Sequence, residues 1–442
     1  MIMSVEQIRE CGKLDFQVPT LGECTIDSPL VHAEFVDEEN RISYFLKKRH
    51  VELCQSEGLE LPSFEPAGPR PRIFHDPAWT RAAIVTCGGL CPGINDVIKS
   101  LVNTLWYRYH VKTIYGIRYG YRGLVAKYRL PPIHLDPDVV DTIHENGGSI
   151  LGSSRGQQSN EEILQTIARM KINVLFTIGG DGTQRATQEI SELAQKRGLP
   201  LSVVGIPKTI DNDLNFMDRT FGFESAVYAT GSIVTSAHVE AKGVHNGIGL
   251  VKLMGRESGF IAACACLANS VANFCLVPEV PFDLDGENGL LKAIERRLKI
   301  KDHAVIVVAE GAGQDLFEET KTSRDASGNI VFNDIGLFLK KRIGDYLFEQ
   351  GHEHSIKYFD PSYIIRTVSA HGTDAVFCLH LAENAVHAAM SGKTGVVVAH
   401  WHGNFIHVPV GLAVRERRRI NPKDQLWQSV LGATRQNNYF YE

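Results

Sequence analysis

The sequence has few of the features that mark membrane, secreted or polyanion-binding proteins. No stretch reaches about 18 consecutive apolar residues, and the first residues do not combine a positive segment with an apolar one, so neither a membrane partner nor a secretion leader is expected. The nine cysteines are scattered, without a Cys-x-x-Cys pair, which is atypical of a secreted disulfide scaffold. These absences favour a cytoplasmic protein.

An excess of positive charge is also missing. The formal net charge is −5, whereas proteins that bind nucleic acids usually carry a basic stripe that neutralises phosphates. We therefore expect no nucleic-acid partner, although a small phosphorylated ligand would need only a local group of cations. The densest cationic run, residues 415–419 (Arg-Glu-Arg-Arg-Arg), is interpreted as a solvated face or an inter-subunit contact, because charge runs usually mark solvation.

The chain contains enough apolar material for more than one core. Its 442 residues, 43% of them hydrophobic, exceed the roughly 250–300 residues at which single cores stop growing, so two or three domains are expected. From Arg81 onward, apolar runs, glycine turns and amphipathic helices repeat, which is typical of βαβ units around a parallel sheet. The expected strands cover residues 82–85, 113–117, 173–178, 201–206, 247–253, 273–277, 304–309 and 395–399, and the expected helices cover 94–105, 183–197, 223–240, 286–299, 334–349 and 373–391.

Residues 1–80 do not show this repeat. They mix charged and apolar residues and end in a group of prolines, at 62, 66, 69, 71 and 77. Because proline breaks regular structure, we interpret this end as a linker and the whole region as an N-terminal extension.

Two glycine loops follow predicted strands and precede predicted helices. Residues 87–93 (Cys-Gly-Gly-Leu-Cys-Pro-Gly) would let backbone N–H groups approach an anion that a helix dipole also favours. Residues 179–183 (Gly-Gly-Asp-Gly-Thr) add a carboxylate and a hydroxyl. Mg²⁺ prefers one or two carboxylates plus substrate phosphate oxygens, so Asp181 is a candidate magnesium anchor; the alternative is a helix N-cap.

A third loop, residues 207–213 (Pro-Lys-Thr-Ile-Asp-Asn-Asp), concentrates two carboxylates and a cation after the strand predicted at 201–206. Phosphoryl transfer to an alcohol needs a base that accepts the hydroxyl proton and cations over the migrating group. Asp211 suits the base and Lys208 the cation. Loops at the carboxyl ends of strands in one sheet face the same crevice, which is where open α/β sheets bind ligands.

Further clusters suit a phosphorylated sugar. Met254-Gly255-Arg256 follows a predicted strand, and Tyr363 and Arg366 lie three residues apart, close enough to reach one phosphate. Glu310 could accept hydrogen bonds from sugar hydroxyls or cap a turn. Two histidine pairs, 352 with 354 and 400 with 402, lack a nearby third ligand and are interpreted as surface or strand residues.

Taken in order, these motifs resemble the phosphofructokinase family over roughly residues 81–410. The resemblance rests on Gly88-Gly89 with Pro92-Gly93, on 119–124 (Tyr-Gly-Tyr-Arg-Gly-Leu), on 179–183 and 207–213, and on 221–223 (Phe-Gly-Phe), 254–256 and 277–280 (Val-Pro-Glu-Val).

The resemblance implies phosphorylation of fructose 6-phosphate at its 1-hydroxyl, with ATP as co-substrate and Mg²⁺ as cofactor. It makes Asp211 the general base, Asp213 a second carboxylate that orients the metal or the site, and Asp181 the magnesium residue. Arg155 and Arg256 are cations suited to stabilising transition-state charge. The residues expected around ATP are Gly88, Arg155, Gly156, Gly180, Asp181, Gly182 and Thr183. Those expected to hold the sugar phosphate are Lys208, Thr209, Ile210, Asp211, Met254, Gly255, Arg256, Glu310, Tyr363 and Arg366.

Two residues point to different phosphoryl donors. Lys208 is typical of the pyrophosphate-using branch of the family. Gly182 marks ATP use, because an aspartate there would crowd and repel the α-phosphate of a nucleotide. The combination resembles ATP-dependent enzymes with pyrophosphate-like sequences, as in plants and trypanosomatids, and we favour ATP. The alternatives are a pyrophosphate-dependent phosphofructokinase, an NAD or lipid kinase, and a silent regulatory subunit.

For the fold, the resemblance implies an α/β protein with two Rossmann-like three-layer domains, mostly parallel sheets and an N-terminal extension. The expected ATP-binding domain covers 81–222 and about 367–410, and the fructose 6-phosphate-binding domain covers 223–366 and about 411–442. A homotetramer is expected, with residues 1–80 as an inter-subunit arm.

Overall fold

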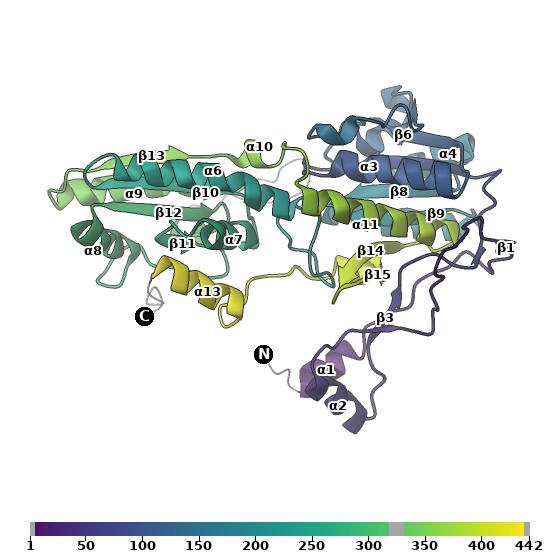
Figure 1. The fold of residues 1–442 in the computed structure, drawn as a ribbon, viewed down its shortest axis with the longest axis horizontal. Helices are drawn as coiled ribbons and strands as arrows, with labels where there is room; N and C mark the ends of the chain where they lie inside the picture. Colours follow the sequence, from purple (N-terminus) through teal and green to yellow (C-terminus); the bar gives the residue numbers. More distant parts are fainter. Residues whose placement is uncertain (1–4, 318–330, 437–442) are drawn as a thin grey trace. The chain divides into compact units, whose positions relative to one another are not determined.

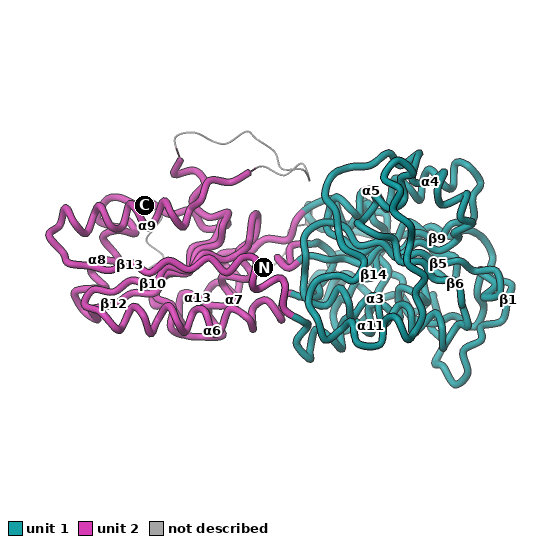
Figure 2. Tube along the Cα trace, turned by 90° about the horizontal axis from the view of Figure 1, so that it is seen from above, with its two compact units in different colours: residues 1–209, 214–222, 369–416 teal, residues 210–213, 223–368, 417–442 magenta. Residues whose placement is uncertain are grey.

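The computed structural model describes residues 5–317 and 331–436, which divide into two compact units (Figure 2). Unit 1 holds the residues up to 209 together with 214–222 and 369–416, and unit 2 holds 210–213, 223–368 and the residues from 417 onward. The expected division differs in two respects. The N-terminal region belongs to unit 1, and the short loop 210–213 belongs to unit 2 although both of its flanks lie in unit 1.

Unit 1 is built on a nine-stranded sheet whose five central strands are parallel (Figure 1). The four strands at its two ends are antiparallel to their neighbours. In spatial order the strands are β2 (Ile42–Ser43), β3 (Ser63–Pro66), β15 (Asn404–Pro409), β14 (Val396–Trp401), β9 (Ser202–Pro207), β8 (Val174–Gly179), β5 (Arg81–Thr86), β6 (Thr113–Ile117) and β7 (Ile133–His134).

Helices cover both faces of this sheet, as parallel strands require. α4 (Asn160–Met170) and α5 (Asp181–Lys196) lie on one face, and α3 (Ile94–Asn103) and α11 (Gly372–Met390) on the other (Figure 2). Apolar side chains of the central strands pack under α4 and α5 in a fully buried layer. The remaining elements of unit 1 are the helices α1 (Val5–Cys11), α2 (Lys48–Ser56) and α12 (Val410–Ala413), and a two-stranded ribbon of β1 (Ile26–Asp27) and β4 (Arg72–Ile73).

Unit 2 repeats the three-layer plan around a smaller, fully parallel sheet. Its strands, in spatial order, are β11 (Phe274–Leu276), β12 (His303–Ala309), β10 (Gly247–Leu253) and β13 (Ser355–Phe359). α6 (Phe223–Lys242) and α7 (Phe260–Asn269) cover one face, and α8 (Leu290–Lys301) and α9 (Ile335–Glu349) the other (Figure 2). α10 (Ser362–Ile365) and α13 (Gln425–Thr434) complete the unit.

The predicted fold class is confirmed, because both units are α/β layers with mostly parallel sheets. Every predicted strand and helix is present, and most boundaries shift by one to four residues. No helix in the described part of the chain is long and apolar enough to cross a membrane.

We interpreted the proline-rich end of the N-terminal region as a linker. This interpretation is wrong for residues 63–66, which form a strand. β3 lies inside the sheet, between β2 and β15, and Pro66 is its last residue. Proline is tolerated here because the N–H that it lacks would point away from β15, toward the side where β2 has already ended. The next residue, Ala67, still donates to Phe405 O of β15 at 2.9 Å. Prolines therefore limit β3 to four residues without preventing it.

A buried charge network ties β3 to the rest of unit 1. The carboxylate of Glu65 accepts from Lys393 Nζ at 3.0 Å, from Arg70 Nη2 at 3.1 Å and from His407 Nδ1 at 2.8 Å. All four side chains are at least 93% buried. Burial alone would raise the pKa of Glu65, but the bonds from His407 and Lys393 outweigh it and lower that pKa to about 2. Glu65 is thus charged in the folded protein, and its removal would leave two buried cations, Arg70 and Lys393, sharing the one carboxylate of Glu38.

We expect Glu65→Gln to lower the free energy of unfolding by roughly 3–5 kcal/mol at pH 7, because the half-exposed Glu38 would then have to balance two buried cations by itself. Since the folded-state pKa is depressed, this contribution is complete above about pH 5 and is lost as the pH falls toward 2. Urea unfolding at several pH values measures both effects. The exposed Glu39→Gln is the control, and equal stability of the two variants would contradict the prediction.

Candidate functional site

Three loops of unit 1 meet at one edge of its sheet. Residues 87–93, 180–183 and 208–209 follow β5, β8 and β9, which are adjacent parallel strands. The loop after β5 is bonded to the middle strand β8, since Cys87 N donates to Ile178 O at 2.9 Å. The loop after β9 is bonded to the last residue of β8, since Lys208 N donates to Gly179 O at 3.0 Å. The structure therefore brings the sequence-predicted phosphate loops together at the carboxyl ends of these strands.

Lys208 links the first loop to the third. The residue is 94% buried, and its ammonium group donates to Gly89 O at 2.5 Å. Gly88 lies directly beside it, since a Cβ added at Gly88 would lie 3.5 Å from Lys208 Nζ. The positive charge of Lys208 is consequently held among the backbone groups of the glycine loop.

A fourth loop joins this group. Gly88 N donates to Ser154 O at 3.0 Å, and Ser153 Oγ donates to Gly88 O at 2.6 Å. These two bonds place the segment with Arg155 and Gly156 against the first loop, with both of those residues exposed. An exposed guanidinium beside a glycine loop is suited to binding a phosphate.

The loop 179–183 begins a helix. α5 starts at Asp181, and Gly180 is its N-cap with extended backbone angles. The alternative interpretation of Asp181 as the N-cap is therefore wrong, because Asp181 already lies in the first helical turn. Its carboxylate is 23% exposed and lies 3.5 Å from Arg185 Nη2, one turn further along α5. Gly182 is exposed, Thr183 is buried, and a Cβ added at Gly182 would meet no atom within 4 Å.

Unit 2 carries a second group of predicted residues, again after adjacent parallel strands. Met254, Gly255 and Arg256 follow β10, Glu310 follows β12, and Tyr363 and Arg366 lie on and after α10, which follows β13. Glu310 N donates to Leu253 O at 2.9 Å, and Gly311 N donates to Gly255 O at 3.0 Å. The Arg366 guanidinium lies 4.6 Å from the ring centroid of Tyr363, so this cation and this phenol share one surface.

The carboxylate loop 210–213 also belongs to unit 2, whereas Thr209, the residue before it, ends the preceding segment of unit 1. Burial raises the pKa of Asp211 well above its ordinary value, and repulsion from Asp213 and Glu310 raises it further. Arg417 and Arg256 act in the opposite direction. Burial likewise raises the pKa of Glu310, against the attraction of Arg256. A carboxylate with a raised pKa is better matched to proton transfer near neutral pH than an ordinary aspartate.

Lys252 is a functional candidate that the sequence did not reveal. It lies on β10, and its ammonium group contacts Asp334 Oδ2 at 3.0 Å and Asp360 Oδ2 at 2.9 Å. Asp334 caps the first turn of α9, and Asp360 accepts from Ser362 Oγ at 2.5 Å at the start of α10. Lys252 thus holds the connection that carries Tyr363. The only available sequence signal was its position two residues before Met254.

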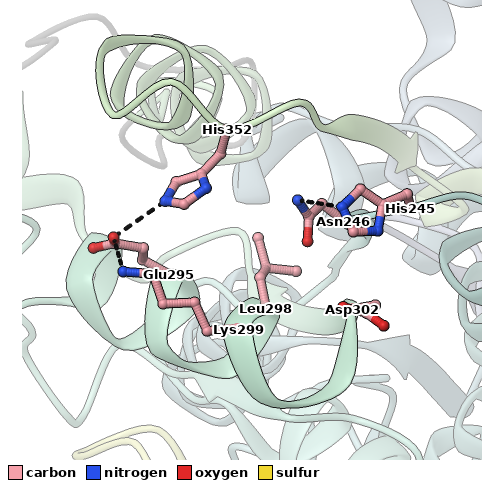
Figure 3. A pocket seen from close by; sticks show the side chains of 7 residues that line it. All are labelled: His245, Asn246, Glu295, Leu298, Lys299, Asp302 and His352. Atoms are coloured by element: carbon pink, nitrogen blue, oxygen red, sulfur yellow. Dashed lines mark hydrogen bonds and ion pairs between the residues drawn. The ribbon is translucent and has the colours of Figure 1, made fainter.

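Of two cavities in the described part of unit 2, one adjoins predicted site residues. A cavity of ≈ 260 Å³ is lined by Lys252, Arg256 and Glu310, together with Asp334 and its neighbours. The other cavity, of ≈ 200 Å³, is lined by His245, Asn246, Glu295, Leu298, Lys299, Asp302 and His352 (Figure 3). Asn246 and Asp302 precede β10 and β12, so this second cavity lies at the amino ends of the strands, opposite the predicted site.

The histidine pairs have partners other than a metal. His352 Nε2 lies 3.2 Å from the buried Glu295, as Figure 3 shows, and His400 Nδ1 lies 3.5 Å from Asp218. In the described residues no group of three His, Cys, Asp or Glu side chains could hold a metal ion by itself.

We expect Lys252→Met to lower the free energy of unfolding by about 1–2 kcal/mol, because it removes two hydrogen bonds to half-exposed carboxylates. Chemical denaturation measures this loss. Lys340→Met, at an exposed position of α9, should stay within about 0.5 kcal/mol of wild type. If both variants unfold at the same denaturant concentration, Lys252 does not stabilise the α10 connection.

The comparisons with known proteins agree with this geometry. The family model for phosphofructokinase matches residues 81–389. An ATP-dependent 6-phosphofructokinase of Borreliella burgdorferi is 47% identical over 436 residues, which cover 96% of this chain and 97% of that protein. One of Amycolatopsis methanolica is 47% identical over 437 residues, which cover 95% of this chain and 94% of that protein.

A solved structure shows the same fold. The pyrophosphate-dependent phosphofructokinase from Marinobacter aquaeolei aligns with a TM-score of 0.66 and 20% identity, over 80% of this chain and 91% of that one. The family match extends over more than half of the sequence, and the two relatives are similar along nearly all of it. The chain therefore belongs to the phosphofructokinase family.

Proposed function

We propose that the protein is an ATP-dependent 6-phosphofructokinase, which transfers the γ-phosphoryl group of ATP to the 1-hydroxyl of fructose 6-phosphate. The products are fructose 1,6-bisphosphate and ADP. The observation that carries the proposal is the continuous segment 207–213. Its lysine is held among the phosphate loops of unit 1, and three residues later Asp211 lies among the charged residues of unit 2.

In this mechanism Asp211 accepts the proton of the 1-hydroxyl while the oxygen bonds to the γ-phosphorus and the bond to the β-phosphate bridging oxygen breaks. Lys208 and Arg155 offer positive charge on the donor side, and Arg256 on the acceptor side, where charge develops during transfer. Thr209, Ile210, Met254 and Gly255 shape the acceptor side. Tyr363 and Arg366 bind the 6-phosphate, and Glu310 accepts from sugar hydroxyls.

The donor loops suit ATP with Mg²⁺. Gly88, Gly156 and Gly180 carry no side chain that would keep a phosphate away from the backbone, and Gly182 and Thr183 lie in the first turn of α5, whose N-terminus would face it. Asp181 is a single, partly exposed carboxylate, which fits Mg²⁺ because this ion takes one or two carboxylates and completes its shell with phosphate oxygens and water. When bound, Mg²⁺ would neutralise charge on the β- and γ-phosphates.

The family resemblance supports a homotetramer. Because β3 lies inside the sheet of unit 1, residues 63–66 do not form part of an inter-subunit arm. All nine cysteines lie in the described part of the chain, and no disulfide joins any of them, which is in keeping with a cytoplasmic protein.

The choice of donor is tested by assaying fructose 6-phosphate turnover with ATP and with pyrophosphate, each with Mg²⁺. We expect turnover with ATP. Turnover with pyrophosphate alone would establish the alternative that Lys208 suggests.

Gly182→Asp tests the reason for ATP use. Because Gly182 is exposed and a Cβ added there meets no atom within 4 Å, folding should be unaffected, and the effect should come from repulsion of the nucleotide phosphates. We expect kcat/KM for ATP to fall roughly tenfold to a hundredfold, equivalent to about 1.4–2.8 kcal/mol. Gly182→Ser adds a side chain without charge and should lose less. Equal losses in the two variants would show that charge is not the cause.

Asp211→Ser should lower kcat by about 10²–10⁴-fold, as expected for the loss of a general base. Binding of fructose 6-phosphate, measured by calorimetry, should persist, since the phosphate contacts of Arg366 remain. Turnover at the wild-type rate would exclude Asp211 as the base.

A further inference from the structure

The cationic run at residues 415–419 does not lie entirely on a solvated face. Arg417 Nη1 donates to Asp213 Oδ2 at 2.8 Å, and the backbone N–H of Arg418 donates to Asp213 O, also at 2.8 Å. The Arg417 side chain is 28% exposed and that of Asp213 only 7%. Two consecutive residues of the run therefore hold both the side chain and the backbone of a residue in the carboxylate loop.

Arg419 behaves as the charge pattern predicts. Its guanidinium lies 2.8 Å from Glu257 Oε2, and the two side chains are 61% and 44% exposed. An exposed pair of this kind contributes little to stability. Within one run of four arginines, the structure thus separates a solvated cation from one that binds the carboxylate loop.

Ile420, the residue after the run, is linked through Glu279 to the turn before α7. Ile420 N donates to Glu279 Oε1 at 2.9 Å, and the same carboxylate accepts from Gly259 N at 3.0 Å. Gly259 is the residue before α7, three positions after Arg256. Ser258 Oγ in turn donates to Asp211 O at 3.3 Å. Segment 417–420 is therefore bonded to the carboxylate loop and, through Glu279, to the turn that carries Arg256.

The charged groups that act on Asp211 are Asp213 and Glu310, which repel its negative form, and Arg256 and Arg417, which attract it. Arg256 precedes the turn at Ser258 and is expected to bind substrate. Arg417 is bonded to Asp213 and is supplied by a segment that no motif of the family resemblance includes. Its charge is fixed at all accessible pH values because guanidinium does not deprotonate in proteins.

We propose that Arg417 is a positioning residue for phosphoryl transfer, which fixes Asp213 and with it the loop that presents Asp211 to the acceptor hydroxyl. The inference rests on the proposed function, because it concerns the geometry and charge state of the base in that reaction. The Arg417 contact supplies what two carboxylates separated by a single residue require, namely a cation that offsets their repulsion and holds the loop in one arrangement.

The test compares Arg417→Gln with Arg419→Gln, which removes a neighbouring charge of the same run from an exposed pair. At saturating fructose 6-phosphate and ATP, we expect Arg417→Gln to lower kcat about tenfold or more at pH 7, and Arg419→Gln to match wild type. The acid limb of the kcat–pH profile should move to higher pH in Arg417→Gln, because losing a positive charge raises the pKa of the base. KM for ATP should change less than about twofold.

Two further variants separate positioning from general destabilisation. Arg417→Lys keeps the charge, so the acid limb should stay at the wild-type pH even if kcat falls through loss of the planar contact. Adding Arg417→Gln to Asp213→Asn should cost little more than Asp213→Asn alone, since the two residues act through one bond. An unshifted acid limb in Arg417→Gln, or full additivity with Asp213→Asn, would overturn the inference.

Wild-type enzyme in the same assay distinguishes failure of the proposed function from failure of the proposed role of Arg417. If wild type does not phosphorylate fructose 6-phosphate, the proposed function fails and the role of Arg417 fails with it. If wild type is active and Arg417→Gln has the same kcat and pH profile, only the role of Arg417 is removed.

Discussion

The acceptor half of the site depends on how three acidic side chains are held in one small region. Asp211, Asp213 and Glu310 repel one another, and burial adds to the cost of charging them. Arg256 and Arg417 are the cations that oppose this cost. A neutral Asp211 could not accept a proton, so in the proposed mechanism these two arginines favour the charged form that the base requires.

The parallel sheets explain why the functional residues gather. In each unit, three adjacent parallel strands end at the same edge, and their first following residues carry the charged and glycine-rich groups. In unit 1 these groups are glycines with one lysine and one aspartate, which suits phosphates. In unit 2 they are arginines, a glutamate and a tyrosine, which suits a phosphorylated sugar. The same architecture therefore supports two different ligand chemistries through loop composition alone.

Buried charges connect parts of the chain that are far apart in sequence. Glu65 binds Lys393, 328 residues later, and Asp213 binds Arg417, 204 residues later. In both cases one partner comes from a short segment with little regular structure, and the ion pair fixes that segment against a sheet or loop. Lys252 does the same over shorter distances by joining the starts of α9 and α10. Each of these contacts satisfies a charge that would otherwise be costly to bury.

The sequence by itself determined the α/β layers and the phosphate loops, because both depend on local patterns. Apolar runs alternating with glycine turns and amphipathic helices predicted the five central strands of the unit 1 sheet and three of the four strands of the unit 2 sheet, all except β13. Gly-Gly-Asp-Gly-Thr and Lys-Thr-Ile-Asp-Asn-Asp marked the loops after β8 and β9. Only the tertiary structure decided which charges meet. It placed β3 inside a sheet despite its proline, made Gly180 rather than Asp181 the N-cap of α5, and brought Arg417 to Asp213. Local sequence cannot specify these contacts, since an ion pair across hundreds of residues depends on which segments the completed fold places side by side.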